Sequence, residues 1–191
     1  NGDGTFGAEI TVDSAIDGSI SVETGDFNGD GVLDIASSSL LDRSYGVYLG
    51  NGDGTFGDRI VAGAADQHLA NDVRIGDFNG DGILDLAGAA FGTHTIGIYL
   101  GNGDGTFGAQ MVVDSTASGV RNLATGDFNG DGVLDLAGAV FDNDLFGVYL
   151  GNGDGTFGSQ IVAGANVDGA IFVEAADFNG DGFDDIVGAN H

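Results

Sequence analysis

Four segments of nine residues share one pattern of oxygen-bearing side chains. Each has Asp at positions 1, 5 and 9, Asn at position 3 and Gly at position 6. They are residues 26–34, 77–85, 127–135 and 177–185, and successive copies begin 51, 50 and 50 positions apart. Calcium takes about six to eight oxygen ligands, and its binding loops supply them at alternating positions around a glycine that permits a sharp turn. The four segments therefore predict about four calcium ions, one in each repeat.

Each loop is expected to bind the ion through the side chains of positions 1, 3, 5 and 9 and the backbone carbonyl of position 7. Water completes the coordination shell. The predicted ligands are Asp26, Asn28, Asp30, Val32 and Asp34 in loop 1; Asp77, Asn79, Asp81, Ile83 and Asp85 in loop 2; Asp127, Asn129, Asp131, Val133 and Asp135 in loop 3; and Asp177, Asn179, Asp181, Phe183 and Asp185 in loop 4.

The loops differ from EF-hands, because position 12 is never Glu and both flanks favour strands rather than helices. Without a bidentate Glu we expect modest affinity, similar to the roughly 10⁻⁴–10⁻³ M of extracellular calcium modules. Such an affinity favours an extracellular or cell-surface location. Two alternatives are an Asp/Gly-rich turn that binds nothing, and a magnesium site, which needs a more rigid octahedral shell.

The composition excludes several kinds of partner. The chain has four Arg, no Lys and thirty Asp and Glu residues, which gives a formal charge of −26. Such a chain repels nucleic acid and anionic membrane surfaces, because phosphate binding needs clustered cations. There is no Cys for disulfides, and no apolar run is long enough for membrane insertion.

A second motif recurs at the same period. The segment NGDGTFG begins at residues 1, 51, 102 and 152, and its Asn-Gly and Asp-Gly pairs indicate hairpin turns. Asp53, Asp104 and Asp154 are interpreted as turn residues, with a second ion site as the alternative. Each repeat also contains four short strand-like stretches; the third is YGVYL at residues 45–49 and the fourth covers residues 55–61 in the first complete unit.

Four short strands in a repeat of about 50 residues are typical of a β-propeller blade. We therefore predict an all-β fold, a single β-propeller domain over residues 1–191 built from four-stranded antiparallel blades. The predicted blades cover residues 16–62, 66–113 and 117–163, with a fourth blade split between residues 167–191 and 1–13. The split blade lacks its third strand. A parallel β-helix is the main alternative, although its turns are usually shorter.

The pattern DxNGDGxxD, followed by a Gly-Ala pair and later by TFG, resembles the FG-GAP/VCBS repeat family. The Gly-Ala pairs begin at Gly88, Gly138 and Gly188, and residues 38–39 are Ser-Ser at the matching place in the first repeat. The resemblance implies β-propeller blades similar to those of the integrin α-subunit head, with calcium in the loop joining two strands. Family members also include lectins, adhesins and some polysaccharide lyases.

The sequence favours a non-enzymatic, calcium-binding, extracellular module for structure, self-assembly or adhesion. The three His residues (His68, His94 and His191) lie in variable or terminal positions and are interpreted as solvated rather than catalytic. Other copies of the chain are the first expected partner, by strand addition at the incomplete blade, and glycans or cell-surface proteins are the second. Alternatives are a calcium-dependent lectin, or a propeller fragment of a larger cell-surface protein or polysaccharide-active enzyme.

Overall fold

The computed structural model describes residues 2, 4–63 and 69–191, which form four antiparallel sheets in chain order. Sheet 1 contains β1 (Ser19–Gly25), β2 (Asp34–Ser39), β3 (Ser44–Tyr48) and β4 (Ile60–Ala62). Sheet 2 contains β5 (Ala70–Gly76), β6 (Asp85–Ala90), β7 (Thr95–Tyr99) and β8 (Met111–Asp114). Sheet 3 contains β9 (Val120–Gly126), β10 (Asp135–Val140), β11 (Leu145–Tyr149) and β12 (Ile161–Ala165), with the short 3₁₀ helix η1 (Phe141–Asn143) between β10 and β11. Sheet 4 contains β13 (Ala170–Ala176) and β14 (Asp185–Asn190).

In sheets 1–3 each strand pairs with the next along the chain, so every sheet is a four-stranded meander. The prediction of an all-β fold built from antiparallel four-stranded units is thereby confirmed for these three sheets. Sheet 4 contains only the pair β13–β14 within the part of the chain that the structure describes. No helix in that part is long and apolar enough to cross a membrane.

The fourth strand of each unit is shorter than its sequence indicates. Residues 55–61 were expected to form one strand, but β4 begins only at Ile60. Phe56 instead makes an isolated bridge with Gly50, and the Gly57 N–H donates to the Leu49 carbonyl at 2.8 Å. The chain then leaves the ladder over residues 57–59 and rejoins it at β4. The same division recurs before β8 and β12.

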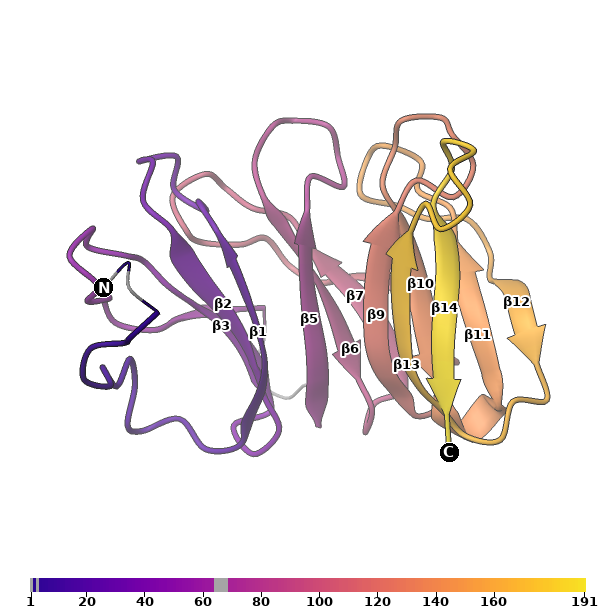
Figure 1. Cartoon of the computed structure of the whole chain (residues 1–191), viewed down its shortest axis with the longest axis horizontal. Helices are drawn as coiled ribbons and strands as arrows, with labels where there is room; N and C mark the ends of the chain where they lie inside the picture. The colour runs from indigo at the N-terminus through magenta and orange to yellow at the C-terminus, as the bar shows by residue number, and fades with distance from the viewer. Residues whose placement is uncertain (1, 3, 64–68) are drawn as a thin grey trace.

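Sheets 1, 2 and 3 follow one another along the long axis of the molecule, and β13 and β14 of sheet 4 overlap sheet 3 in this view (Figure 1). Their first strands contact one another in the order β1, β5, β9 and β13. The described residues that precede β1 lie beside sheet 1, whereas β14 and the C-terminus lie in the other half of the view. Among the described N-terminal residues no strand forms before β1, so completion of residues 167–191 by residues 1–13 stays a prediction.

The hydrophobic core lies between neighbouring sheets rather than inside any one of them. Between sheets 1 and 2, the Tyr45 and Tyr99 rings pack with centroids 5.5 Å apart, and Val73 is completely buried beside them. Similar clusters join sheet 2 to sheet 3 and sheet 3 to sheet 4. Burial of these apolar faces at three successive joints is therefore the main source of tertiary stability.

The second strands of sheets 2, 3 and 4 contain Ala and Gly in their middle, and the neighbouring sheet approaches some of these glycines closely. Gly88 lies in the middle of β6 directly under the Tyr45 ring of sheet 1, where a Cβ atom would overlap the ring. Gly138 occupies the same place in β10, but there the nearest atom to an added Cβ is on Ile96 at 3.4 Å, an ordinary contact. Equivalent glycines of the repeat therefore face different packing.

This difference gives a matched test of the packing between sheets. Gly88→Ala should destabilise the chain by about 1–3 kcal/mol, because the new methyl group overpacks the joint between sheets 1 and 2. Gly138→Ala should be neutral or slightly stabilising, since the space exists and Ala favours extended structure over Gly. Urea unfolding of the two variants measures the difference. Equal free energies of unfolding would contradict the packing described at Gly88.

Candidate metal centre

The four Asp/Gly loops have nearly the same backbone conformation. In loop 1 the glycines at positions 4 and 6, Gly29 and Gly31, have φ of 74° and 82°, and the corresponding pairs in the other loops lie between 75° and 93°. A Cβ atom on Gly29 or Gly31 would meet nothing within 4 Å. The requirement for glycine is therefore conformational, since other residues rarely adopt positive φ.

The carboxylate at position 1 organises the loop backbone. In loop 1, Asp26 Oδ1 accepts the Gly29 N–H and Asp26 Oδ2 accepts the Gly31 N–H, each at 2.8 Å. The same two contacts recur at Asp77, Asp127 and Asp177. The N–H of Gly31 and its neighbours lowers the pKa of Asp26, so the exposed loop presents an ionised carboxylate at neutral pH.

The oxygens of positions 1, 3 and 5 lie close together in the loop. The Asp30 N–H donates to both Asp26 Oδ1 (3.1 Å) and Asn28 Oδ1 (3.0 Å), so these two oxygens share one donor. The Asn28 amide in turn donates to Asp30 Oδ2 at 2.9 Å. All these contacts are solvent-exposed, and loops 2 and 3 repeat them. Such a group of hard oxygens, two of them from carboxylates, suits a hard cation.

The carboxylate at position 9 has a different environment from the others. Asp34 begins β2, is completely buried, and accepts the N–H of Phe27 through Oδ2 and the N–H of Gly50 through Oδ1, both at 2.8 Å. It therefore joins the loop to the chain leaving β3. Equivalent pairs of contacts are made by Asp85, to Phe78 and Gly101 at 2.9 and 2.8 Å, and by Asp135, to Phe128 and Gly151 at 2.9 and 2.8 Å.

Sequence reasoning did not foresee this structural role, because spacing alone gives positions 1, 3, 5 and 9 the same weight. Burial raises the pKa of Asp85 and of Asp135, while the two N–H donors to each carboxylate lower it. Asp185 in loop 4 is less buried, and among the residues described here it accepts only the Phe178 N–H, at 3.3 Å. The signal in the sequence was the apolar stretch that follows each position 9, which draws this Asp into the sheet.

The remaining predicted ligand, the carbonyl of position 7, belongs to a residue whose N–H is also engaged. The N–H of Val32 donates to Asp30 Oδ1 at 2.8 Å, and Ile83, Val133 and Phe183 repeat the contact. Among the described residues, no three His, Cys, Asp or Glu side chains are grouped closely enough to hold a metal ion by themselves. The fit to calcium thus rests on the mixed set of carboxylate, amide and carbonyl oxygens, and the ligand assignment stays a prediction.

The NGDG turns have their own hydrogen bonds. Asp53 Oδ1 accepts the N–H of Thr55 at 3.0 Å and its hydroxyl at 2.6 Å, which lowers the pKa of Asp53. Asp104 and Asp154 make the same pair of contacts with Thr106 and Thr156. These contacts account for Asp and Thr in the turn without a second ion.

The turns of sheets 2 and 3 also reach the loop of the preceding sheet. The Gly105 N–H of sheet 2 donates to the Phe27 carbonyl of loop 1 at 3.2 Å, and the Phe27 and Phe107 rings meet edge to face with centroids 5.9 Å apart. Gly155 and Phe157 of sheet 3 repeat this arrangement on Phe78 of loop 2. The loops therefore lie at the joints between sheets, and ordering a loop also orders a joint.

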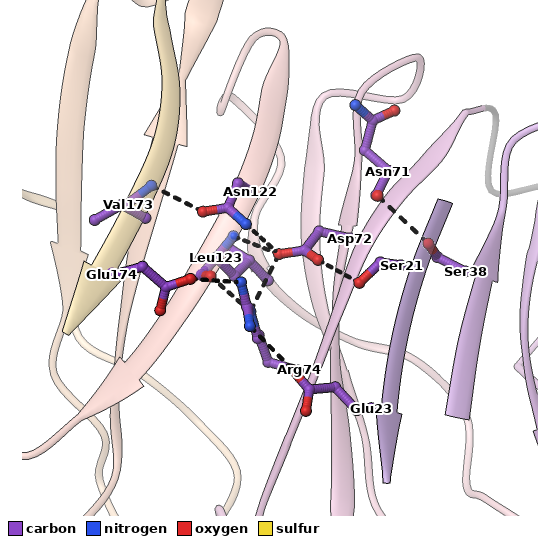
Figure 2. Close-up of polar contacts among 10 residues, drawn as sticks. All are labelled: Ser21, Glu23, Ser38, Asn71, Asp72, Arg74, Asn122, Leu123, Val173 and Glu174. Carbon is purple, nitrogen blue, oxygen red and sulfur yellow. Dashed lines mark hydrogen bonds and ion pairs between the residues drawn. The ribbon is translucent and has the colours of Figure 1, made fainter. Parts of the chain in front are cut away.

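A polar network joins the first strands of all four sheets (Figure 2). Arg74 on β5 contacts Glu23 of sheet 1 at 2.9 Å, Asp72 of its own strand at 3.2 Å and Glu174 of sheet 4 at 3.5 Å. Its Nε–H also donates to the Leu123 carbonyl of sheet 3 at 2.7 Å. Sequence reasoning missed this network, although the sequence contains a signal for it. One position of the repeat varies in charge from copy to copy: Glu23, Arg74, Ala124 and Glu174.

Asp72 is the second centre of the network. It is 4% exposed and accepts the Ser21 hydroxyl at 2.6 Å, the Asn122 amide at 2.9 Å and the Leu123 N–H at 2.8 Å. Burial raises the pKa of Asp72, whereas Arg74 and the hydrogen bonds from Ser21 and Leu123 lower it by a smaller amount. The Asn122 Oδ1 then accepts the Val173 N–H at 2.8 Å. Polar side chains thus connect sheets 1 to 4 in order.

The histidines are placed away from the loops where the structure describes them. His94 Nδ1 accepts the Gly119 N–H at 3.1 Å, a contact between neighbouring sheets. The His191 N–H donates to the carbonyls of Asp168 and Gly169. His68 lies outside the described residues.

Comparison with known proteins agrees with the repeat pattern. A family model for the FG-GAP-like repeat matches residues 77–138. The chain is similar to the solved structure of an Agrocybe aegerita lectin that recognises non-reducing terminal N-acetylglucosamine, with a TM-score of 0.63 and 26% identity over 87% of this chain and 46% of the lectin. It is also similar to the V. cholerae biofilm matrix protein Bap1, with a TM-score of 0.49 and 22% identity over 91% of this chain and 28% of that protein. No curated protein sequence matches the chain.

These findings describe an all-β protein with an FG-GAP-like repeat and a fold similar to that of a lectin. The chain spans less than half the length of either solved protein. The similarity therefore concerns the fold and does not assign the activity of those longer proteins to this chain.

The two kinds of carboxylate in a loop predict different effects of mutation in the absence of metal. Asp85→Ala should destabilise the chain by about 2–4 kcal/mol, because the buried N–H of Phe78 and the partly buried N–H of Gly101 lose their acceptor. Asp81→Ala, at the exposed position 5 of the same loop, should cost less than about 1 kcal/mol. Denaturant unfolding in a chelating buffer compares the two. Equal losses of stability would show that position 9 has no separate structural role.

Proposed function

We propose that the chain is a non-enzymatic, calcium-stabilised module of an extracellular adhesion or matrix protein. The observation that carries this proposal is the repeated clustering of exposed oxygens at positions 1, 3 and 5 of the four loops. Calcium would be held by these oxygens, by the carbonyl of position 7 and by water. The position 9 carboxylate would contribute through lone pairs left free by its two N–H donors.

The metal would act on the joints as well as on the loops. Without it, three carboxylates lie within nine residues of each loop and repel one another. Calcium would remove this repulsion and restrict the loop, and the contacts of Phe27 and Phe78 with the next sheet would be strengthened as a consequence. A modest affinity suits an environment in which calcium is abundant, which supports an extracellular location.

A binding role is favoured over catalysis by how the acidic groups are used. The carboxylates of the loops and turns are engaged by backbone N–H groups and Thr hydroxyls. The buried Asp72 is neutralised by Arg74. The proposed module therefore presents side chains for structure and recognition rather than a general acid or base.

Glycan binding is the second candidate function. It is favoured by the similarity to the Agrocybe aegerita lectin, at 26% identity over 87% of this chain. A glycan array probed in calcium and in chelator tests this candidate, and calcium-dependent binding to a defined set of glycans is the expected result. Absence of binding across the array would reject the lectin candidate without affecting the calcium proposal.

Self-association and ring closure are proposed for sheet 4. Within the described residues β14 pairs only with β13, so one edge of this sheet offers unpaired backbone groups. A strand from another copy of the chain would complete this edge, and addition of further blades would close a propeller. Light scattering of residues 1–191 over a range of concentrations is expected to show an assembly larger than a monomer. A monomer at every concentration would remove self-association from the proposal.

The calcium proposal predicts a metal-dependent stability. With a dissociation constant of about 10⁻⁴–10⁻³ M, about 10 mM calcium should stabilise the folded chain by roughly 1.4–2.7 kcal/mol for each occupied loop. Asp81→Ala should lose the calcium-dependent stabilisation that comes from one loop. Asp58→Ala, which removes an exposed charge outside the loops, should retain the stabilisation from all four loops. Unfolding curves with calcium and with chelator measure both. Identical curves in the two buffers would reject structural calcium.

A further inference from the structure

A cavity of about 420 Å³ opens where the first strands of the four sheets begin. Its walls include residues of β1, β5, β9 and β13, whereas the Asp/Gly loops follow the other ends of these strands. The cavity is therefore separate from the calcium loops. Its volume falls within the roughly 300–1,000 Å³ of small-molecule sites.

Two of the four basic residues of the chain, Arg74 and Arg121, line the cavity, and Asp72 is the single carboxylate among its lining residues. Arg74 is already paired with Asp72, and with Glu23 and Glu174 beside the cavity. Arg121 is therefore the lining cation to consider for an anionic ligand.

Arg121 is held in place but has no anionic partner. Its guanidinium carbon lies 4.1 Å from the centroid of the Phe141 ring and 5.1 Å from that of Phe91. These rings fix the plane of the guanidinium through cation–π contacts. Within the described part of the chain no carboxylate pairs with Arg121, and its buried Nε–H has no acceptor. A stacked guanidinium with unused donors is suited to a planar carboxylate.

The rest of the wall combines polar groups with apolar surface. Asn71 presents a side-chain amide that points away from the contacts of Asp72 in Figure 2. Phe172, which is 57% exposed, and Ile171 supply apolar surface on the β13 side. A sugar ring matches this combination, because it has hydroxyl groups at its edge and C–H groups on its faces.

We propose that this cavity binds a carboxylate-bearing saccharide, with Arg121 as the residue that recognises the carboxylate. The Arg121 guanidinium donates to the two carboxylate oxygens. The Asn71 amide hydrogen-bonds ring hydroxyls, and the C–H face of the sugar lies toward Phe172. This saccharide site is distinct from the proposed calcium sites, since none of its residues belongs to one of the four Asp/Gly loops.

The test compares two sugars that differ only at one carbon. Methyl α-galactosiduronate carries a carboxylate where methyl α-galactoside carries a CH₂OH group. ¹H–¹⁵N spectra of the whole chain, titrated with each sugar at one fixed calcium concentration, are expected to shift at the amides of residues 71, 121 and 172 with the uronoside only. Equal shifts with both sugars, or no shifts near the cavity with the uronoside, would overturn the proposal.

Variants assign the recognition to Arg121. Arg121→Met retains an unbranched apolar stem between the two rings and should weaken uronoside binding roughly tenfold or more, since a hydrogen-bonded charge is lost. Arg59→Met is the matched control, because Arg59 donates to Ser44 outside this cavity, and it should bind as the unmodified chain does. If Arg121→Met does not fold, Arg121→Lys, which keeps the charge but not the planar donor pair, should bind with intermediate affinity.

Three results would contradict the assignment. Unchanged affinity of a folded Arg121→Met variant is the first, and unchanged affinity of Arg121→Lys is the second. The third is equal affinity for N-acetylglutamate, which would show that the cavity selects a carboxylate and not a saccharide. Calcium binding is read separately from the unfolding curves, so failure at the cavity and failure of the calcium proposal are distinguishable.

Discussion

The buried carboxylate at position 9 is the constraint on which each repeat depends. Asp34, Asp85 and Asp135 are completely buried, and each binds two backbone N–H groups, one inside its loop and one beyond the third strand of its sheet. A buried charge is costly unless its hydrogen bonds are complete, so this Asp fixes the loop and the third strand together. The exposed oxygens of positions 1, 3 and 5 are consequently held on a loop whose two ends are already fixed.

The loops are constant from repeat to repeat, whereas the first strands of the sheets vary. The loops are almost identical in sequence and geometry, and through Phe27 and Phe78 they join sheet 1 to sheet 2 and sheet 2 to sheet 3. The first strands differ from repeat to repeat, and their polar residues form a single network around Arg74 and Asp72. Repetition thus gives the chain its architecture, and the few positions that break the repetition place Arg74 and Arg121 at the cavity. Sequence variation between repeats is expected at positions where a repeat protein recognises a ligand.

Much of the architecture could be predicted from the sequence because its signals are local. The 50-residue period, the Asn-Gly and Asp-Gly turns and the alternation of apolar residues gave the all-β class and the three four-stranded sheets. The burial of position 9 could not be predicted from ligand spacing, because it depends on the N–H of Gly50, sixteen residues further along the chain. The stacking of Arg121 could not be predicted either, since Phe91 belongs to another sheet. Contacts between repeats are set by how the sheets pack, and no short pattern encodes them.

Hydrogen exchange of individual amides in chelating buffer tests the central claim most directly. The amides of Phe78 and Gly101, which bind the buried Asp85, are expected to exchange only through global unfolding, as the core of β6 does. The amides of Gly80 and Gly82, which bind Asp77 through solvent-exposed contacts, should exchange much faster and become slower when calcium is added. Fast exchange at Phe78 and Gly101 in chelator would contradict the account, because it would show that the carboxylate at position 9 does not hold the loop without metal.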